Sequence, residues 1–286
     1  MSDTPPLLQV RNLCKYFPLK PRGVLKAVDG VSFDLKAGQT LGIVGESGSG
    51  KTTAVRCILR ALAPTSGSAL FHNNGQTTDL ATIPERSIKP LRREMQMIFQ
   101  DPYSSLNPRM TVGEIIAEPL LIHGIGNRKQ RIDQVNQMLQ CVGLLPEHAG
   151  RYPHAFSGGQ RQRVGIARAL ILKPALVVAD ECVSALDVSV RARVLALLRD
   201  LQIKMHLTYI FVSHDLSVVR RICDHVLVMY KGRVMEQAPT ERLFADPHHA
   251  YTRVLLSAIP YPDPDRPLRP LRVADLSPAE LEPLGS

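Results

Sequence analysis

The sequence predicts an α/β fold with a mostly parallel core sheet, an N-terminal antiparallel β subdomain and an inserted helical subdomain. Short apolar runs that end at polar residues alternate with stretches of helical spacing, a pattern typical of a parallel sheet covered by helices. Residues from about 103 to 172 interrupt this rhythm with helix-like segments. We therefore expect a main domain over residues 1–245 that contains the insertion, followed by a C-terminal extension over residues 246–286.

The individual elements follow from their local patterns. Alternating apolar residues at 8–13 and 31–35 predict strands of the antiparallel subdomain. Apolar runs at 40–44, 175–179 and 208–212 predict core strands, and the stretches at 51–62 and 190–205 predict helices. Residues 226–237 predict a hairpin that turns at Lys231 and Gly232, and the proline-rich tail after Pro260 is expected to be extended or disordered.

Composition is that of a globular protein, with 44% hydrophobic and 21% charged residues. The longest apolar stretches are interrupted by Lys173 and Pro174, short of the roughly 20 residues that a membrane span requires. The N-terminus lacks the basic and apolar regions of a signal peptide, so we expect a cytoplasmic location, with any membrane attachment through another protein. The net charge of +9 permits nucleic acid binding, but the basic residues are scattered.

The segment "GESGSGKT" matches the phosphate-binding loop pattern, and it follows a predicted strand and begins a predicted helix. Glycines let backbone N–H groups close around phosphates at a helix N-terminus. Lys51 is expected to reach the β- and γ-phosphates, and the Thr52 hydroxyl to bind Mg²⁺. The residues expected to bind nucleotide here are Gly45, Glu46, Ser47, Gly48, Ser49, Gly50, Lys51, Thr52 and Thr53.

A second glycine-rich element, "FSGGQRQR", begins another predicted helix and offers a second anion-binding helix start. With this element the chain resembles the ATP-binding cassette family over about residues 7–260, because S-G-G-Q is that family's signature. The resemblance implies ATP and Mg²⁺ as ligands. It also implies that two subunits pair head to tail, so that the signature of one contacts the γ-phosphate held by the other. The signature residues are Ser157, Gly158, Gly159 and Gln160.

The other elements of the family follow in order along the chain. The resemblance assigns Gln100 to a position near Mg²⁺ and the attacking water, Asp180 to Mg²⁺, and Glu181 to the general base. It assigns His214 to the γ-phosphate and Phe17, rather than Tyr16, to stacking on adenine. The catalytic residues expected on this basis are Glu181, His214, Gln100 and Lys51, and the metal ligands are Thr52, Gln100 and Asp180.

One residue departs from the family pattern. Cys182 follows Glu181 where the family has proline, which would fix φ after the general base. No catalytic group is missing, so we expect activity to survive. The five cysteines show no C-x-x-C spacing, and reduced thiols are expected rather than a zinc site, an iron–sulfur cluster or disulfides. A redox role for Cys182 would require a lowered thiol pKa.

Four segments together resemble the ATPase subunits of bacterial dipeptide, oligopeptide, opine and nickel importers: "FQDPYSSLNPRMTV", "RYPHAFSGGQRQR", "SALDVSVRA" and "DPHHAYTRVLLSAIP". The resemblance implies a second ATPase subunit, which is more often a similar chain than an identical one. It also implies two membrane permeases, an external solute-binding protein, a position at the cytoplasmic face of the inner membrane, and no nucleic acid partner.

Three other classes compete with this interpretation. A soluble cassette ATPase that acts on nucleic acid or ribosomes fits the positive charge, but such proteins carry long insertions or two cassettes in one chain. A small-molecule kinase leaves the signature at Ser157 unexplained. An inactive regulatory partner conflicts with the presence of Lys51, Asp180, Glu181 and His214. An ATPase subunit of an importer is therefore the expected function.

Overall fold

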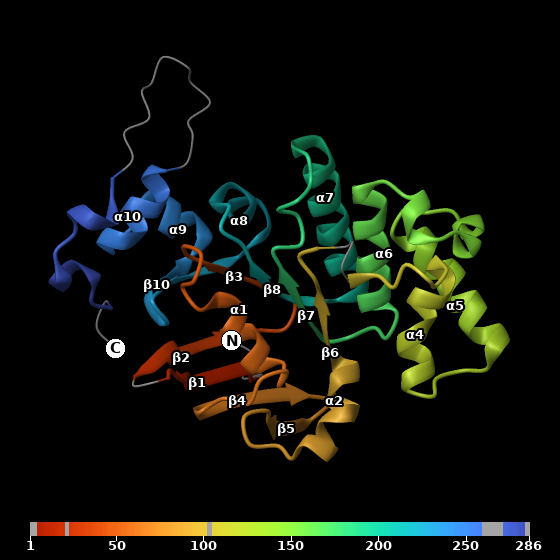
Figure 1. Ribbon diagram of the computed structural model, residues 1–286, viewed down its shortest axis with the longest axis horizontal. Coiled ribbons are helices and arrows are strands. Elements are labelled where there is room, and N and C mark those ends of the chain that lie inside the picture. The colour runs from red at the N-terminus through yellow and green to blue at the C-terminus, as the bar shows by residue number, and fades with distance from the viewer. Residues whose placement is uncertain (1–4, 21–22, 102–104, 259–270, 284–286) are drawn as a thin grey trace. The chain divides into compact units, whose positions relative to one another are not determined.

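The computed structural model describes residues 5–20, 23–101, 105–258 and 271–283 (Figure 1). The chain divides into two compact units, one formed by residues 1–83 and 210–286 and the other by residues 84–209. Among the described residues, no helix is both long enough and apolar enough to cross a membrane.

The first unit contains a four-stranded antiparallel sheet in the order β2-β1-β4-β5. Its strands are β1 (Leu8–Pro18), β2 (Val24–Leu35), β4 (Ser66–Asn73) and β5 (Gln76–Asp79). Leu8 and Val10 alternate onto the buried face of β1, and a register shift between Val10 and Leu13 places Leu13 on the same face. The predicted N-terminal antiparallel subdomain is confirmed, although β4 and β5 had no clear pattern in the sequence.

Core strands of the first unit include β3 (Thr40–Val44), β9 (His225–Tyr230) and β10 (Arg233–Pro239). Strand β3 pairs in parallel with β9, and β9 pairs antiparallel with β10. The hairpin turns at Lys231 and Gly232 as predicted, and both residues have the positive φ (44° and 85°) that a two-residue hairpin loop favours. The helices are α1 (Lys51–Ile58), α8 (Leu216–Ile222), α9 (Thr240–Ala245) and α10 (Ala250–Ser257).

The second unit holds the helices of the predicted insertion and the strands β6 (Met95–Ile98) and β7 (Leu176–Asp180), which pair in parallel. Its helices include α2 (Ile88–Glu94), α4 (Val112–Ile122), α5 (Arg128–Cys141), α6 (Gly158–Leu170) and α7 (Val188–Met205). Thr111 and Asn127 begin α4 and α5 with capping boxes, which satisfy the first free backbone N–H groups. Strand β8 (Thr208–Val212) contains the junction between the two units. The predicted α/β fold with a parallel-rich core is confirmed.

Two expectations from the sequence need correction. The helix predicted over residues 51–62 ends at Ile58, because Arg60 takes the left-handed conformation (φ 54°). The tail is not extended throughout: residues 271–283 include the short 3₁₀ helices η4 (Val273–Asp275) and η5 (Pro278–Leu281). Ser277 begins η5 with a capping box to Glu280, a signal that the proline-rich composition obscured. Residues 259–270 lie outside the described residues.

Candidate functional site

The phosphate-loop segment connects β3 to α1 and closes around the side chain of Lys51. The buried ammonium donates hydrogen bonds to the carbonyls of Gly45 (2.8 Å) and Glu46 (2.7 Å) and to the Ser49 hydroxyl (3.3 Å). A buried cation is stable only when such acceptors surround it. The loop therefore gathers positive charge at the start of α1.

Glycines are required in this loop by its backbone. Gly45, Gly48 and Gly50 have φ values of 147°, 81° and 101°. A Cβ on Gly45 would lie 2.1 Å from the Met229 carbonyl oxygen, and one on Gly50 would lie 2.1 Å from that of Ala27. Gly50 also begins α1 without a side-chain cap hydrogen bond, and the N-terminus of a helix favours a negative charge. The loop fits a phosphate group.

Two neighbouring aromatic residues of β1 differ in their surroundings. The Tyr16 hydroxyl donates to Asp29, and this hydrogen bond raises the pKa of Tyr16 above its usual value. Phe17 has no polar group to satisfy, and its ring lies 5.1 Å from the Lys15 ammonium. Tyr16 is held in a polar network, and the stacking role expected of Phe17 stays a prediction.

His214 follows β8 in the first unit and is exposed. The preceding residue, Ser213, donates its backbone N–H to the carbonyl of Ile43 at 3.2 Å. Asp215 then begins α8 by accepting from the backbone N–H groups of Ser217 and Val218. These bonds fix the segment that carries His214. The bond from Ser213 attaches this segment to β3, the strand that precedes the phosphate loop.

In the second unit, Gln100 and Glu181 meet directly. The Gln100 side-chain amide donates to the Glu181 carboxylate at 3.0 Å, although 81 residues separate them. They follow the ends of β6 and β7, which are paired parallel strands, so their side chains share one edge of the sheet. Asp180 is the last residue of β7 and is 5% exposed.

Glu181 has a φ of 47°, in the left-handed region that non-glycine residues rarely adopt. A tight turn holds it there, because Ser184 donates to the Glu181 carbonyl through both its N–H (3.1 Å) and its hydroxyl (2.8 Å). Cys182 lies inside this turn and is buried. Burial raises the pKa of its thiol to about 12, so the reactive thiolate is scarce at neutral pH. A redox role for Cys182 has no support.

The signature begins α6, as the sequence predicts. Ser157 caps the helix: its hydroxyl accepts from the Gln160 N–H at 3.4 Å, and the Gln160 side chain accepts from the Ser157 N–H at 3.0 Å. A Cβ on Gly159 would lie 2.4 Å from a methyl group of Val190 on α7. A cavity of about 370 Å³ adjoins this helix start, and Ser157, Gly159, Arg163 and Arg193 are among its lining residues.

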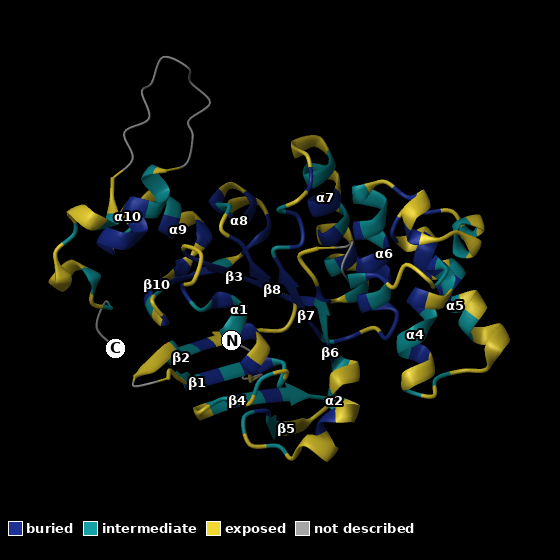
Figure 2. Cartoon of the chain, in the orientation of Figure 1, coloured by how far each residue is buried: buried dark blue, intermediate teal, exposed yellow. Residues whose placement is uncertain are grey.

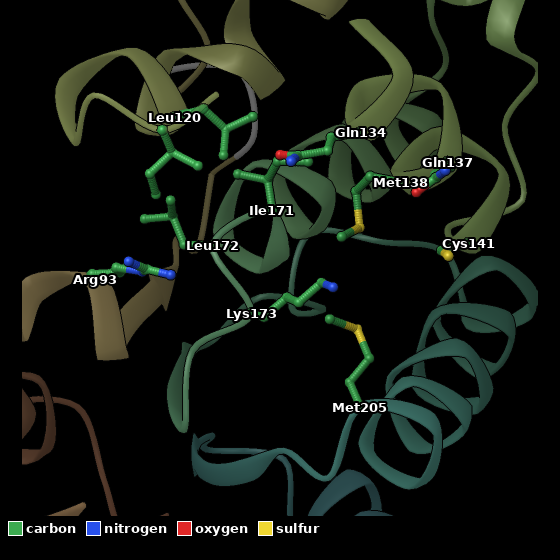
Figure 3. Close-up of a pocket in the computed structure, with 11 residues that line it drawn as sticks. Arg93, Leu120, Gln134, Gln137, Met138, Cys141, Ile171, Leu172, Lys173 and Met205 are labelled. Atoms are coloured by element: carbon green, nitrogen blue, oxygen red, sulfur yellow. The ribbon is translucent and has the colours of Figure 1, made fainter. Parts of the chain in front are cut away.

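A second cavity in this unit, of about 480 Å³, carries none of the predicted site residues. Figure 3 shows its lining side chains, which come from α2, α4, α5, the segment after α6 and the end of α7. Leu120, Met138 and Met205 give it an apolar surface, and Arg93 and Lys173 add positive charge. None of its lining residues belongs to the phosphate loop or to the signature.

One contact to the phosphate loop has no local signal in the sequence. The Tyr251 hydroxyl in α10 accepts a hydrogen bond from the Glu46 N–H at 3.2 Å, across 205 residues. His249 and Tyr251 belong to the segment that resembles importer subunits, but neither spacing nor composition indicates a contact with Glu46.

Comparison with protein families agrees with this geometry. The model for the ABC transporter family matches residues 28–184, more than half of the chain. The chain belongs to the ABC transporter family. A second model, for the C-terminal region of oligopeptide/dipeptide transporters, matches residues 235–283.

Similar proteins and similar solved structures include other ATP-binding transport proteins and cassettes. A putative peptide import ATP-binding protein of Brucella ovis is 54% identical, over 93% of this chain and 82% of its own. The oligopeptide transport ATP-binding protein OppF of Bacillus subtilis is 52% identical, over 92% of this chain and 85% of its own. The ATP-binding cassette MJ0796, solved as a dimer with ADP and Pi, superposes with a TM-score of 0.72 at 27% identity, covering 82% of this chain and 98% of its own. The cbiO1 protein of Clostridium perfringens gives a TM-score of 0.73 at 27% identity, over 85% of this chain and 92% of its own.

Proposed function

We propose that this chain is the ATP-binding and ATP-hydrolysing subunit of an importer for di- or oligopeptides or related solutes. The observation that carries the proposal is the phosphate loop, in which Lys51 and the uncapped start of α1 fit a phosphate group. The match of residues 235–283 to an oligopeptide/dipeptide transporter region supports the choice of importer. We assign residues 1–245 to the ATPase domain and residues 246–286 to its C-terminal extension.

ATP would bind with its phosphates on the loop and its base on Phe17. Lys51 would exchange the carbonyls of Gly45 and Glu46 for the β- and γ-phosphates, because the ammonium prefers anionic acceptors. All residues of the loop, from Gly45 to Thr53, would contribute backbone or side-chain contacts.

Mg²⁺ is the metal ion that the proposed function implies. No group of three or more His, Cys, Asp or Glu side chains within the described ranges is placed to hold a metal ion. Mg²⁺ is commonly held by one or two protein oxygens together with substrate phosphates and water. Thr52, Asp180 and Gln100 would supply those oxygens. The ion would neutralise charge that develops on the phosphates during hydrolysis.

Hydrolysis requires a base that accepts a proton from the attacking water. Glu181 would take this role, and the hydrogen bond from Gln100 at 3.0 Å orients its carboxylate. His214 would donate to the γ-phosphate. The turn closed by Ser184 would keep Glu181 in its left-handed conformation through the cycle.

Pairing completes the site. Ser157, Gly158, Gly159 and Gln160 would contact the γ-phosphate bound to a second ATPase subunit, and the reciprocal contact would close the pair head to tail. The partner would be a similar chain or a second copy of this one. Two permeases, with a solute-binding protein outside the cell, would complete the importer and hold this chain at the cytoplasmic face of the inner membrane.

The experiment is a pull-down of tagged Glu181→Gln protein from detergent-solubilised membranes with Mg²⁺ and ATP, followed by mass spectrometry. This variant should bind ATP and remain in the closed pair, which preserves the complex during purification. We expect two permeases and an ATPase partner. Lys51→Ala protein is the matched control, since without the loop ammonium the ATP-stabilised pair should be lost.

The competing function is a cassette ATPase that acts on nucleic acid or ribosomes, which the net charge of +9 favours mildly. Recovery of ribosomal proteins or nucleic acid in place of permeases would overturn the transport proposal and leave the ATPase chemistry in place.

A further inference from the structure

Helix α10 of the C-terminal region contacts the phosphate loop within the first unit. The Tyr251 hydroxyl accepts from the N–H of Glu46, the second residue of the loop, at 3.2 Å. Tyr251 is fully buried, and burial raises its pKa to about 12, so the hydroxyl stays neutral near pH 7. Figure 2 shows the buried face of α10.

Both backbone polar groups of Glu46, the N–H and the carbonyl, make hydrogen bonds. Its N–H donates to Tyr251, and its carbonyl accepts from the Lys51 ammonium at 2.7 Å. If Lys51 turns to the phosphates of ATP, as the proposed function requires, the carbonyl loses this partner. The carbonyl then keeps the N–H of Ser49 at 3.2 Å. The bond from the Glu46 N–H to Tyr251 does not involve Lys51, so it remains to fix the loop when the ammonium turns to ATP.

Tyr251 is itself held from several sides. Its ring lies against that of Tyr230, with centroids 4.6 Å apart. His249 begins α10, and its Nδ1 accepts from the Tyr251 N–H at 3.0 Å. Because Nδ1 accepts, Nε2 carries the proton and donates to the Glu282 carbonyl at 2.9 Å. The His249 N–H donates to the buried Glu236 carboxylate at 3.0 Å.

Glu282 belongs to the segment 271–283 and makes a second contact. Its carboxylate pairs with Arg233 at 3.2 Å, and Arg233 also pairs with Asp29 at 3.2 Å. Asp29 is the partner of Tyr16, which precedes Phe17. Each exposed pair contributes little alone. The segment nonetheless connects α10 with the strand expected to hold the adenine.

We propose that Tyr251 is a positioning residue for the phosphate loop, and that His249 and the C-terminal segment fix Tyr251 in place. Glu236, α10 and residues 271–283 would thus pre-organise the ATP site from outside the family's shared motifs. This inference rests on the proposed function, because it assigns Tyr251 a role in ATP binding. Pre-organisation raises affinity by removing the cost of ordering the loop on binding.

The alternative is that Tyr251 only fills the core, as a fully buried aromatic residue commonly does. Loss of its hydroxyl would then lower stability and leave the loop and the affinity for ATP unchanged. Tyr251→Phe separates the two cases because it keeps the ring contact with Tyr230 and removes only the acceptor of the Glu46 N–H.

The test uses the full chain and two measurements. Hydrogen exchange of the Glu46 amide, without nucleotide, should be faster in Tyr251→Phe than in the wild type. Equilibrium dialysis with Mg²⁺ and ATP should give a Kd about fivefold higher, the size expected for one hydrogen bond. The matched control is Tyr230→Phe, which alters the same ring pair and should leave both the exchange rate and the Kd unchanged.

Unchanged exchange and unchanged Kd in Tyr251→Phe, with a wild type that binds ATP, would overturn the inference and leave the proposed function intact. If the wild type and Lys51→Ala both fail to bind ATP, the proposed function fails. In that case the comparison of Glu46 amide exchange between Tyr251→Phe and the wild type alone decides whether Tyr251 fixes the loop.

Discussion

Glu181, the proposed general base, illustrates how neighbouring residues hold a side chain in an unfavourable backbone conformation. A non-glycine residue with φ of 47° is uncommon, and the two hydrogen bonds from Ser184 to its carbonyl keep it there. Gln100 then fixes the carboxylate from β6. The turn between Glu181 and Ser184 therefore fixes the backbone that carries the carboxylate.

Cys182→Pro tests whether the departure from the family pattern impairs the site. Proline is favoured at the second position of a tight turn, where Cys182 lies, and Ser184 already closes that turn. We expect the ATP turnover of the variant to stay within about threefold of the wild type. Cys182→Ala is the control for loss of the buried thiol. A rise of tenfold or more would show that cysteine weakens the native site.

Glu236 makes the stability of the fold depend on pH. Burial opposes its ionisation, but the N–H groups of His249 and His248 bind its carboxylate, and the net effect lowers its pKa below the usual 4.5. A lowered pKa stabilises the fold above about pH 4.5, and this contribution is lost as the pH falls through the folded-state value. Glu236→Gln should therefore cost about 1–3 kcal/mol in the free energy of unfolding at pH 7.

Urea unfolding at pH 7 and at pH 4 measures this effect. The difference between Glu236→Gln and the wild type should be smaller at pH 4. The exposed Glu241, replaced by glutamine, is the control and should show little difference at either pH. An equal loss at both pH values would mean that the charge of Glu236 has no part in holding His248 and His249.

Among the residues, motif spacing predicted the phosphate loop and the signature, because these contacts are made within a few residues of sequence. The hydrogen bond between Gln100 and Glu181 was only indirectly predictable, from their positions after two parallel strands. Tyr251 was not predictable, because its partner Glu46 lies 205 residues away and the hydroxyl leaves no periodic signal.

At the scale of elements, the two glycines at the start of α6 differ in the space around them. A Cβ on Gly158 would make an ordinary contact with Leu186 at 3.9 Å, whereas one on Gly159 would lie 2.4 Å from Val190 on α7. Gly159 therefore lets two helices approach closely, and Gly158 has room for a side chain.

Gly159→Ala should lower the free energy of unfolding by about 1–3 kcal/mol, the usual cost of overpacking. Gly158→Ala is the matched control and should be neutral or slightly stabilising, because alanine is the better helix former. Adding Val190→Ala to Gly159→Ala should restore part of the loss, as measured by urea unfolding. Equal effects of the two glycine substitutions would contradict the packing role of Gly159.

The buried strands β3 and β8 were predicted well, whereas the end of α1 and the C-terminal end of the chain were not. Strands β3 and β8 begin and end where their apolar runs do, because they are buried over their whole length. The proline-rich composition of the tail predicted an extended or disordered chain. The capping box at Ser277 and the contacts of Glu282 with His249 and Arg233 instead order residues 271–283.

At the scale of the whole molecule, the chain combines a family-wide ATP site with a C-terminal region shared with oligopeptide/dipeptide transporters. The pairing of this chain with a second ATPase subunit follows from the proposed function.

The most direct test of the account is steady-state phosphate release by the full chain with Mg²⁺ and ATP, compared between the wild type and Glu181→Gln. Bound ATP is measured in the same samples after gel filtration. We expect Glu181→Gln to release phosphate at least about 100-fold more slowly and to retain ATP in a closed pair. Turnover at the wild-type rate in Glu181→Gln would contradict the account, because Glu181 would then not be the general base.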